Sequence, residues 1–376
     1  MIKKIITSLS LTLMIFASNL NAQNTSSMNF TPTITSDITI LNHNEYLTNL
    51  KNNSSKRYNG YIFIESDNSF KFNDNISFDV NINLYPDAQF KTNKTINYQP
   101  YHNIANNERD FNLVNNAAII EEIKIKFTNE DLELQLGKFN PQFGKIYDKN
   151  KRIGAYSWQF AQDYNLREKI GGQISALLEN SKLSFSAFIN DATQLSNSAL
   201  NKRGAADDDQ KIPGNSGSLS SYSINYEGHN PFKINNLFYQ IGYRSMSASH
   251  ENQKRENGYL IGAHYLYELN DNTKIIPLFE IVKIDNLLGK EKSDAIYKTA
   301  SIQCKYSSWT TSATYNSRKL TQITESNITS NEDIFQLTIG YNITKNLAID
   351  LTRAEIDNHN NKFNSLAANF IFNKKF

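Results

Sequence analysis

The sequence has few of the residues that usually cross-link or divide an exported chain of this length. One cysteine, Cys304, occurs in 376 residues, so an intrachain disulfide and a cysteine-rich zinc site are both excluded. Only 7 prolines and 15 glycines are present, and no linker rich in proline, glycine or serine separates two parts of the chain. We therefore expect a single domain that is stabilised by other means.

Long apolar segments are also scarce. The one mostly apolar run follows Lys3 and Lys4, extends to Ala17, and leads into a polar stretch that ends at Ala22. It is shorter than the roughly 20 apolar residues of a spanning helix, and its layout is that of a secretory signal peptide. We expect residues 1–22 to be removed, which leaves residues 23–376 as one domain.

Neither net charge nor histidine spacing indicates a nucleic-acid partner or a metal. Removal of Lys3 and Lys4 lowers the basic count from 39 to 37, equal to the 37 acidic residues, and a neutral chain is a poor nucleic-acid binder. The acidic run at 207–209 lacks regularly spaced further oxygen ligands and is interpreted as a solvated loop tip. No histidine pair has metal-site spacing; the histidines are His43, His102, His229, His250, His264 and His359. No specific catalytic triad stands out either, so we predict neither a cofactor nor an enzymatic activity.

Aromatic residues are abundant in a chain of polar average, and apolar residues alternate with polar ones. There are 20 tyrosines and 22 phenylalanines, while the mean hydropathy is −0.54. From Asn75 to Leu84 every second residue is apolar, and the same period recurs over 119–127 and 132–137. A strand with this period has one apolar and one polar face. The combination is typical of transmembrane β-barrels, whose strands contact lipid on one side and water on the other.

Short and long connections take turns along the chain, and this order predicts a topology. The alternation is typical of an up-and-down antiparallel barrel with short periplasmic turns and long extracellular loops. Counting strands between them gives sixteen and places both termini on the same side. The expected short turns are 66–74, 129–130, 179–181, 227–235, 270–273, 307–308 and 342–346, and the expected long loops are 41–57, 85–115, 140–168, 191–217, 245–257, 286–294, 318–333 and 355–362.

Sixteen strands enclose an aqueous channel, whereas eight leave an interior filled by side chains. Loop 140–168 is the predicted constriction, because its aromatic residues favour packing against an inner wall over exposure. Its charged candidates, with the residue that follows, are Lys145, Lys149, Lys151, Arg152, Asp163, Arg167, Glu168 and Lys169. The wall residues predicted from parity to line the pore are Lys124, Lys126, Glu133, Gln135, Gln240, Arg244, Gln303 and Lys305. The basic excess in the loop suggests a mild anion preference; ordinary solvated loop charge is the alternative interpretation.

The opposite parity places side chains on the lipid side. Cys304 shares its parity with Ile302 and Tyr306 and is expected to face outward. Aromatic residues near strand ends are expected to form girdles at the membrane interfaces; they are Tyr226, Tyr239, Tyr243, Tyr315, Tyr341 and Trp309. The alternation that leads to the terminal Phe376 resembles the assembly signal of outer-membrane barrels, although Lys374 departs from the usual apolar residue.

Three segments in the middle third of the chain carry a family resemblance: LGKFNPQFG at 136–144, residues 154–172, and residues 187–203. They resemble phosphate-selective-type porins and, more closely, porins of alphaproteobacteria. The resemblance implies an outer-membrane passive channel for small polar solutes, commonly a homotrimer, whose third loop narrows the pore. Phosphate selectivity is not expected, since the predicted lumen mixes both charge signs with amides. Gly137 and Gly144 would allow sharp bending where the strand becomes a loop.

A second function remains open. The barrel could anchor a surface adhesin or antigen whose long outer loops, notably 191–217, bind a partner. Those loops are rich in asparagine, serine and charge, as any exposed loop would be. A hydrolase embedded in the barrel would need a fixed polar constellation at the rim, and the sequence does not indicate one.

Overall fold

The computed structural model describes residues 32–48, 56–86, 116–146, 151–193, 195, 213–231, 234–322, 328–358 and 361–376. The predicted signal peptide, Lys149 and most of loop 191–217 lie outside these ranges. Within them, no helix is long and apolar enough to cross a membrane.

The described chain is almost entirely β-structure, with one short helix, α3 (Ala161–Tyr164), and one 3-10 turn, η6 (Leu287–Gly289). The strands are β1 (Thr33–Thr48), β2 (Lys56–Lys71), β3 (Ile76–Pro86), β4 (Asn116–Thr128), β5 (Leu132–Phe139), β6 (Lys169–Leu178), β7 (Ser181–Asn190), β8 (Ser221–His229), β9 (Leu237–Met246), β10 (Glu256–Tyr265), β11 (Tyr267–Asn270), β12 (Thr273–Asp285), β13 (Ser293–Tyr306), β14 (Trp309–Gln322), β15 (Ile328–Asn342), β16 (Leu347–Asn358) and β17 (Asn361–Lys375). β10 and β11 both pair with β12 and form one spanning strand that is interrupted at Leu266.

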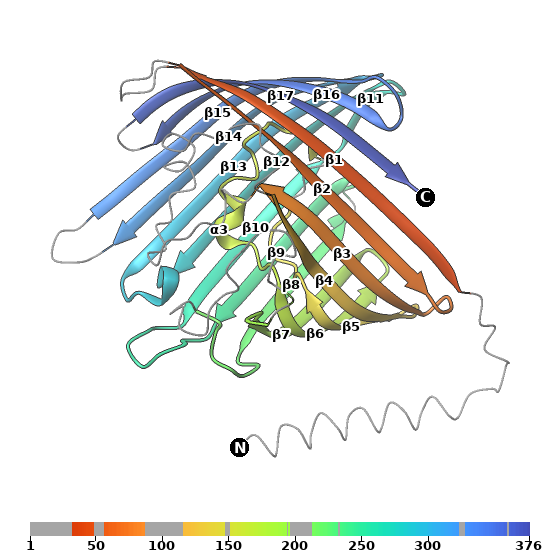
Figure 1. Ribbon diagram of the computed structural model, residues 1–376, viewed down its shortest axis with the longest axis vertical. Coiled ribbons are helices and arrows are strands. Elements are labelled where there is room, and N and C mark those ends of the chain that lie inside the picture. Colours follow the sequence, from red (N-terminus) through yellow and green to blue (C-terminus); the bar gives the residue numbers. More distant parts are fainter. Residues whose placement is uncertain are drawn as a thin grey trace.

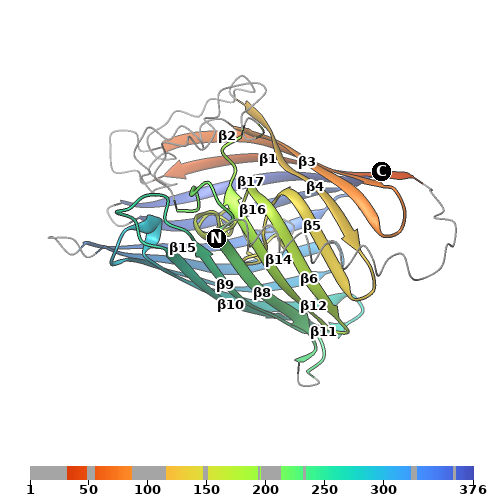
Figure 2. The same cartoon turned by 90° about the horizontal axis from the view of Figure 1, so that it is seen from below.

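The sheet closes on itself. Each strand pairs antiparallel with the next along the chain, and β1 pairs with β17 from Asp37↔Lys375 to Thr48↔Asn364. Figure 1 shows the tilted strands of the cylinder, and Figure 2 shows them from below. Closure leaves no strand edge unpaired, which is the condition for a β-structure to cross hydrocarbon. The predicted sixteen-stranded antiparallel barrel is confirmed.

The period of two sorts side chains between the two faces of the wall. On β13 to β15, Ile302 and Leu337 are about half exposed on the outer face, whereas Ser301, Thr314 and Gln336 are buried on the inner face. The polar inner side chains hydrogen-bond to each other, as Ser301 Oγ does with Thr314 Oγ1 at 2.7 Å. The outer surface is therefore apolar and the interior polar, as lipid outside and water inside require.

Cys304 and the candidate girdle residues lie on the outer face by register, as their parity predicts. Trp309 and Tyr341 are opposite each other beside short turns, with ring centroids 4.7 Å apart. Tyr226 and Tyr239 form a similar pair on β8 and β9, at 5.6 Å. Their role as membrane-interface girdles stays a prediction.

Several predicted loops are instead extended strands. β1 continues to Thr48 and pairs there with Lys56 of β2, so most of the loop expected over 41–57 is a hairpin. The same holds for 318–333, where β14 runs to Gln322, and for 355–362. At the other end, β2 extends to Lys71, which reduces the turn expected over 66–74 to residues 72–75. Polar residues occupy both faces of these strand ends, so the alternation disappears although the backbone pairing continues.

A β-bulge in β4 corrects one predicted orientation. The alternation places Glu121 on the apolar side of this strand. The register of β3 against β4 shifts between Asn81 and Ile82, so that Asn81 faces Glu122 while Ile82 faces Ile120. The extra residue, Glu121, is thereby turned inward together with Glu122, because a bulge sets two residues against one.

Candidate functional site: the interior of the barrel

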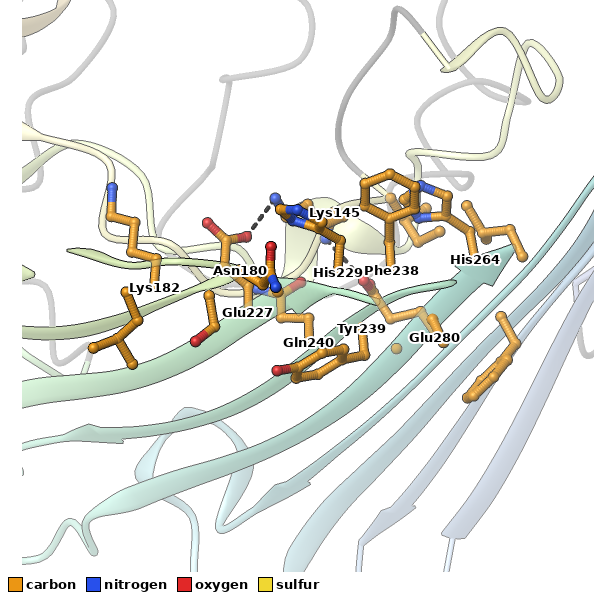
Figure 3. A pocket seen from close by; sticks show the side chains of 18 of the residues that line it. Lys145, Asn180, Lys182, Glu227, His229, Phe238, Tyr239, Gln240, His264 and Glu280 are labelled. Atoms are coloured by element: carbon orange, nitrogen blue, oxygen red, sulfur yellow. Dashed lines mark hydrogen bonds and ion pairs between the residues drawn. The ribbon is translucent and has the colours of Figure 1, made fainter. Parts of the chain in front are cut away.

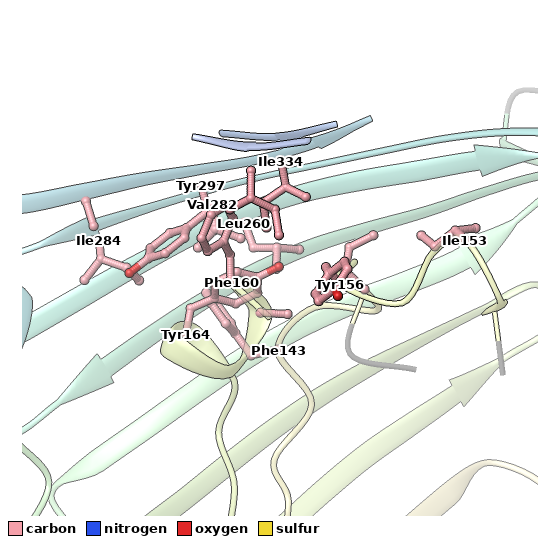
Figure 4. Close-up of a cluster of buried hydrophobic side chains, with 14 of the residues drawn as sticks. Phe143, Ile153, Tyr156, Phe160, Tyr164, Leu260, Val282, Ile284, Tyr297 and Ile334 are labelled. Atoms are coloured by element: carbon pink, nitrogen blue, oxygen red, sulfur yellow. The ribbon is translucent and has the colours of Figure 1, made fainter. Parts of the chain in front are cut away.

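The described parts of the segment 140–168, residues 140–146 and 151–168, lie inside the barrel and are packed against its wall. Its apolar side chains Phe143, Ile153, Tyr156, Phe160 and Tyr164 are all at most 3% exposed. They pack on the inward side chains Leu260, Val282, Ile284, Tyr297 and Ile334, as Figure 4 shows. Removing this much apolar surface from water stabilises the packed position by about 1.5–3 kcal/mol for each large side chain. The segment is therefore a fixed internal partition.

Both ends of the partition are attached to the bulge in β4. Arg167 Nε donates to Glu121 Oε1 at 2.7 Å, and Asn140 Nδ2 donates to the same oxygen at 2.9 Å. The Asn140 amide donates to Glu122 Oε1 at 2.8 Å, and its side-chain oxygen accepts from the Glu168 amide at 2.8 Å. The bulge thus supplies two adjacent carboxylates to the two ends of the segment.

Gly137 and Gly144 have positive φ angles of 135° and 93°, a backbone conformation that favours glycine. Gly144 lies in the segment that follows β5, whereas Gly137 lies within β5, and Lys138 and Phe139 after it still pair with β6. At Gly137 a Cβ would stand 2.4 Å from the Ile123 carbonyl oxygen, so glycine is required there by the close approach of β4.

The middle of the partition is anchored on the opposite wall. Arg152 Nε donates to both carboxylate oxygens of Asp350 on β16, each at 3.0 Å. The carbonyl of Lys151 accepts from Gln303 Nε2 at 2.6 Å, and the Tyr156 amide donates to Gln336 Oε1 at 3.0 Å. Backbone groups that no helix or sheet satisfies are therefore paired with wall side chains.

Tyr156 also reaches the seam at which the barrel closes. Its hydroxyl is hydrogen-bonded to Glu45 on β1 and to Ser365 on β17. Glu45 in turn lies 3.6 Å from His43 Nε2. One side chain of the partition thus joins the first and last strands from inside.

Helix α3 carries a buried ion-pair network. Arg318 of β14, which is fully buried, donates to Asp163 Oδ2 at 2.7 Å and pairs with Glu332 of β15. Its guanidinium lies 5.0 Å from the Phe160 ring centroid, a cation–π distance. Beside it, Tyr164 donates to Glu280 Oε1 at 2.6 Å. Burial, reinforced by the Glu280 charge, raises the pKa of the Tyr164 phenol well above its usual range, so this group stays a hydrogen-bond donor.

The remaining charged candidates of the loop occupy different places. Lys145 is 44% exposed and pairs with Glu227 of β8, while its amide donates to Glu280 Oε2 at 2.8 Å. Glu168 accepts from Lys138 Nζ at 3.1 Å, and Lys138 also pairs with Asp191 at 3.0 Å. Lys169 belongs to β6, where its Nζ donates to Asn190 Oδ1 at 2.7 Å. Lys149 lies outside the described residues.

The register places all eight wall candidates on the inner face. Lys126 Nζ contacts Glu133 Oε2 at 3.0 Å, and Gln135 donates to Glu133 Oε1 at 2.8 Å. Lys124 pairs with Glu122 at 2.6 Å. Gln240 donates to Asn225 at 2.6 Å, and Arg244 pairs with Glu256 at 2.6 Å. Gln303 donates to the Lys151 carbonyl, and Lys305 is exposed. Their part in lining a pore stays a prediction.

In three lysine ion pairs of the interior the cation is more exposed than its carboxylate. The side-chain exposures are 44% and 18% for Lys145 and Glu227, and 34% and 8% for Lys126 and Glu133. Lys182, which also pairs with Glu133, is 25% exposed. Lys124 and Glu122 are nearly equal, at 15% and 18%, and in the deeply buried pairs of Lys138 with Glu168 and of Arg318 with Asp163 the carboxylate is the more exposed partner. Water inside the barrel therefore meets more cationic than anionic surface along these pairs.

Sequence reasoning missed the wall partners of the partition. Glu45 lies in a segment that was expected to be a loop, and the strands of Asp350 and Glu280 contain further acidic residues, so nothing in the pattern distinguishes these three. Arg318 was expected in a loop, but it lies on the inner face of β14. A charged residue at a sequence position that faces the barrel interior is a signal that could have been used. Burying such a charge costs free energy unless it is paired, so it predicts a partner inside the barrel.

A cavity of about 350 Å³ lies where the partition meets the wall near the short-turn end of β6 to β12. Its polar lining includes Lys145, Lys182, Glu227, Gln240 and Glu280, and three rings, His229, Phe238 and His264, face it from the wall (Figure 3). Across the described ranges, no group of three or more His, Cys, Asp or Glu side chains is arranged to hold a metal ion.

Comparison with known proteins identifies relatives by structure alone. No family model and no curated protein sequence matches the chain. Among solved structures, OccAB3 of Acinetobacter baumannii is similar at a TM-score of 0.53 and 12% identity, over 91% of this chain and 99% of that one. OpdK of Pseudomonas aeruginosa, determined with vanillate, has a TM-score of 0.53 and 10% identity, over 91% and 99%. The outer-membrane channel DcaP of A. baumannii gives 0.53 and 10%, over 92% and 97%. These comparisons do not confirm the phosphate-selective family, and at these identities the likeness establishes the fold: this chain has the porin-type barrel fold of outer-membrane channels.

Proposed function

We propose that the protein is a passive diffusion channel of the bacterial outer membrane for small polar or ionic solutes. The observation that carries the proposal is the closed sixteen-stranded barrel with an apolar outer face and a polar inner face. A barrel of this size is wider than its wall side chains can fill. Solved structures of the same fold include one described as an outer-membrane channel. The partition 140–168 is the constriction in this proposal.

Ion conductance of the purified, refolded protein in planar bilayers tests it. We expect stepwise conductance increments, and a smaller increment for Lys145→Trp, since Lys145 is a well-exposed side chain of the partition. Lys298→Trp is the matched control, because Lys298 lies on the outer face of β13. A correctly folded barrel that carries no current would contradict the proposal and would favour the role of a surface anchor.

We further infer a mild anion preference. It is supported by the greater exposure of Lys126, Lys145 and Lys182 than of the carboxylates paired with them, because exposed charge of one sign attracts counter-ions. Reversal potentials in a potassium chloride gradient should show chloride to be favoured. The variant Lys126→Gln/Lys145→Gln/Lys182→Gln should lower the anion-to-cation permeability ratio, whereas Lys298→Gln should leave it unchanged. Cation preference of the unmodified protein would refute the inference.

Assembly and export complete the proposal. We expect a homotrimer, as reported for OmpT of Vibrio cholerae, a barrel with a TM-score of 0.51 and 7% identity to this chain. Unheated gel electrophoresis of the extracted protein should show a band at three times the monomer mass; a monomer in mild detergent would exclude it.

Mature protein from the outer membrane should begin at Gln23, which N-terminal sequencing can check.

A further inference from the structure

We propose that the cavity beside Lys145 binds a flat aromatic ring that carries an uncharged carboxamide-type group. This inference rests on the proposed channel function and adds a solute class to it. The cavity volume of about 350 Å³ falls at the lower end of the range for small-molecule sites, so it suits a single substituted ring. Its position between partition and wall places it inside the barrel (Figure 3).

Three rings form a continuous strip on the wall of this cavity. His229, Phe238 and His264 occupy neighbouring inner-face positions on β8, β9 and β10, with register pairs His229↔Phe238 and Phe238↔His264. The Phe238 and His264 centroids are 4.5 Å apart with planes inclined by 7°, and His229 lies 6.0 Å from Phe238. A further flat ring extends such a strip in the stacked or edge-to-face geometry that aromatic pairs prefer.

Space beside the strip comes from Gly262. The next inner-face row contains Gln240, Gly262 and Glu280, and at Gly262 no side chain fills the wall. The nearest atom to a Cβ built there is Glu280 Cγ, at 3.4 Å. A ring against the strip therefore has polar groups of this row within reach of its substituent.

The polar lining favours a neutral ligand that both donates and accepts hydrogen bonds. The cations Lys145 and Lys182 are offset by the paired Glu227 and Glu133, and Glu280 adds a further negative charge, so no excess positive charge selects a carboxylate. Glu227, which lines the cavity and is 18% exposed, is an acceptor for a ligand N–H, and the lysines favour a carbonyl oxygen.

Binding of benzamide and of cyclohexanecarboxamide by the refolded protein in detergent micelles tests the inference. The two probes share the carboxamide and differ in ring flatness, and protein-free micelles correct for partitioning. By equilibrium dialysis we expect benzamide to bind about ten-fold more tightly. Phe238→Leu should abolish this difference. Phe335→Leu, which makes the same change on the outer face of β15, should preserve it.

A second variant guards against misfolding of the first. Gly262→Val fills the gap and keeps all three rings, so it should abolish benzamide binding while the unheated gel mobility stays that of a folded barrel. Equal binding of the two probes, unchanged binding to the folded Phe238→Leu or Gly262→Val proteins, or tighter binding of benzoate than of benzamide would each overturn the proposal. Conductance of the same preparations separates the two claims: a conducting protein without benzamide selectivity refutes only the site, and a selective protein without conductance refutes only the channel.

Discussion

The anchor between Arg152 and Asp350 provides a direct test of whether the partition is held by its wall contacts. Arg152→Ala removes the guanidinium that donates to both oxygens of Asp350. The carboxylate, 5% exposed, then remains in the wall without this partner. Arg152→Ala/Asp350→Asn removes the uncompensated charge as well, and the two variants separate the loss of an anchor from the cost of a buried anion.

Breaking a buried ion pair by removing one partner costs about 3–5 kcal/mol. Arg152 is 15% exposed, so water partly replaces the lost contact and the lower end of that range, about 3 kcal/mol, applies. At about 1.4 kcal/mol for each factor of ten, the packed position of the partition should become roughly a hundred-fold less favourable. The double variant should regain about half of this free energy, because a neutral amide is cheaper to bury.

Amide hydrogen exchange of residues 151–160 measures the effect locally. The Tyr156 amide donates to Gln336 Oε1 at 3.0 Å, so its exchange reports how often the partition leaves the wall. Arg353→Ala is the matched control, because Arg353 and its partner Glu355 are 70% and 62% exposed and such pairs contribute about 0–1 kcal/mol. Exchange in Arg152→Ala as slow as in Arg353→Ala would refute the assigned role of the anchor.

Three further outcomes follow from the geometry. Gly137→Ala should fail to refold, because its Cβ would stand 2.4 Å from the Ile123 carbonyl oxygen, while Gly262→Ala refolds normally; equal refolding yields would show that the close approach of β4 does not require glycine at this position. The pKa of Tyr164 is raised in the folded barrel, so its contribution to the free energy of unfolding is present below the unfolded-state pKa of about 10 and is lost as the pH rises above that value. The free energy of unfolding of Tyr164→Phe should therefore fall less at alkaline pH than that of the unmodified protein. Identical pH profiles of the two proteins would disprove this. Tyr156→Phe should lower the free energy of unfolding by about 1–3 kcal/mol, whereas Tyr315→Phe, on the outer face, should change it little; equal losses would argue against the seam contact.

Alternation of apolar and polar residues was sufficient to predict the barrel, because lipid and water act on every second residue of a spanning strand. Residues 76–84 and 132–137 lie in paired strands, as predicted, and Asn75 precedes the first of them. The rule failed where the chain leaves the membrane. Residues 41–48 and 318–322 have polar groups on both faces, so no periodicity distinguishes a paired strand from a loop, and only the partner strand reveals it.

The interior contacts could be predicted only in part. The aromatic content of 140–168 indicated that this segment packs inward, since Tyr156 and Phe160 would be poorly accommodated in an exposed loop. Its partners could not be identified, because Asp350 and Gln336 lie about 180–200 residues away in sequence. A shift of register by one residue also reverses which side chains face inward. The bulge at Glu121 is such a local shift, and it determines where both ends of the partition are attached.

The contact of Tyr156 with both Glu45 and Ser365 has a consequence for how the cylinder forms. The strands that carry these two residues are the most distant in sequence, so joining them costs more chain entropy than forming any hairpin. A phenol that binds both strands at once can hold them close before their backbone ladder is complete. We expect the internal segment to act as a scaffold during assembly, so that the folding pathway constrains its sequence in addition to the packing of the finished barrel.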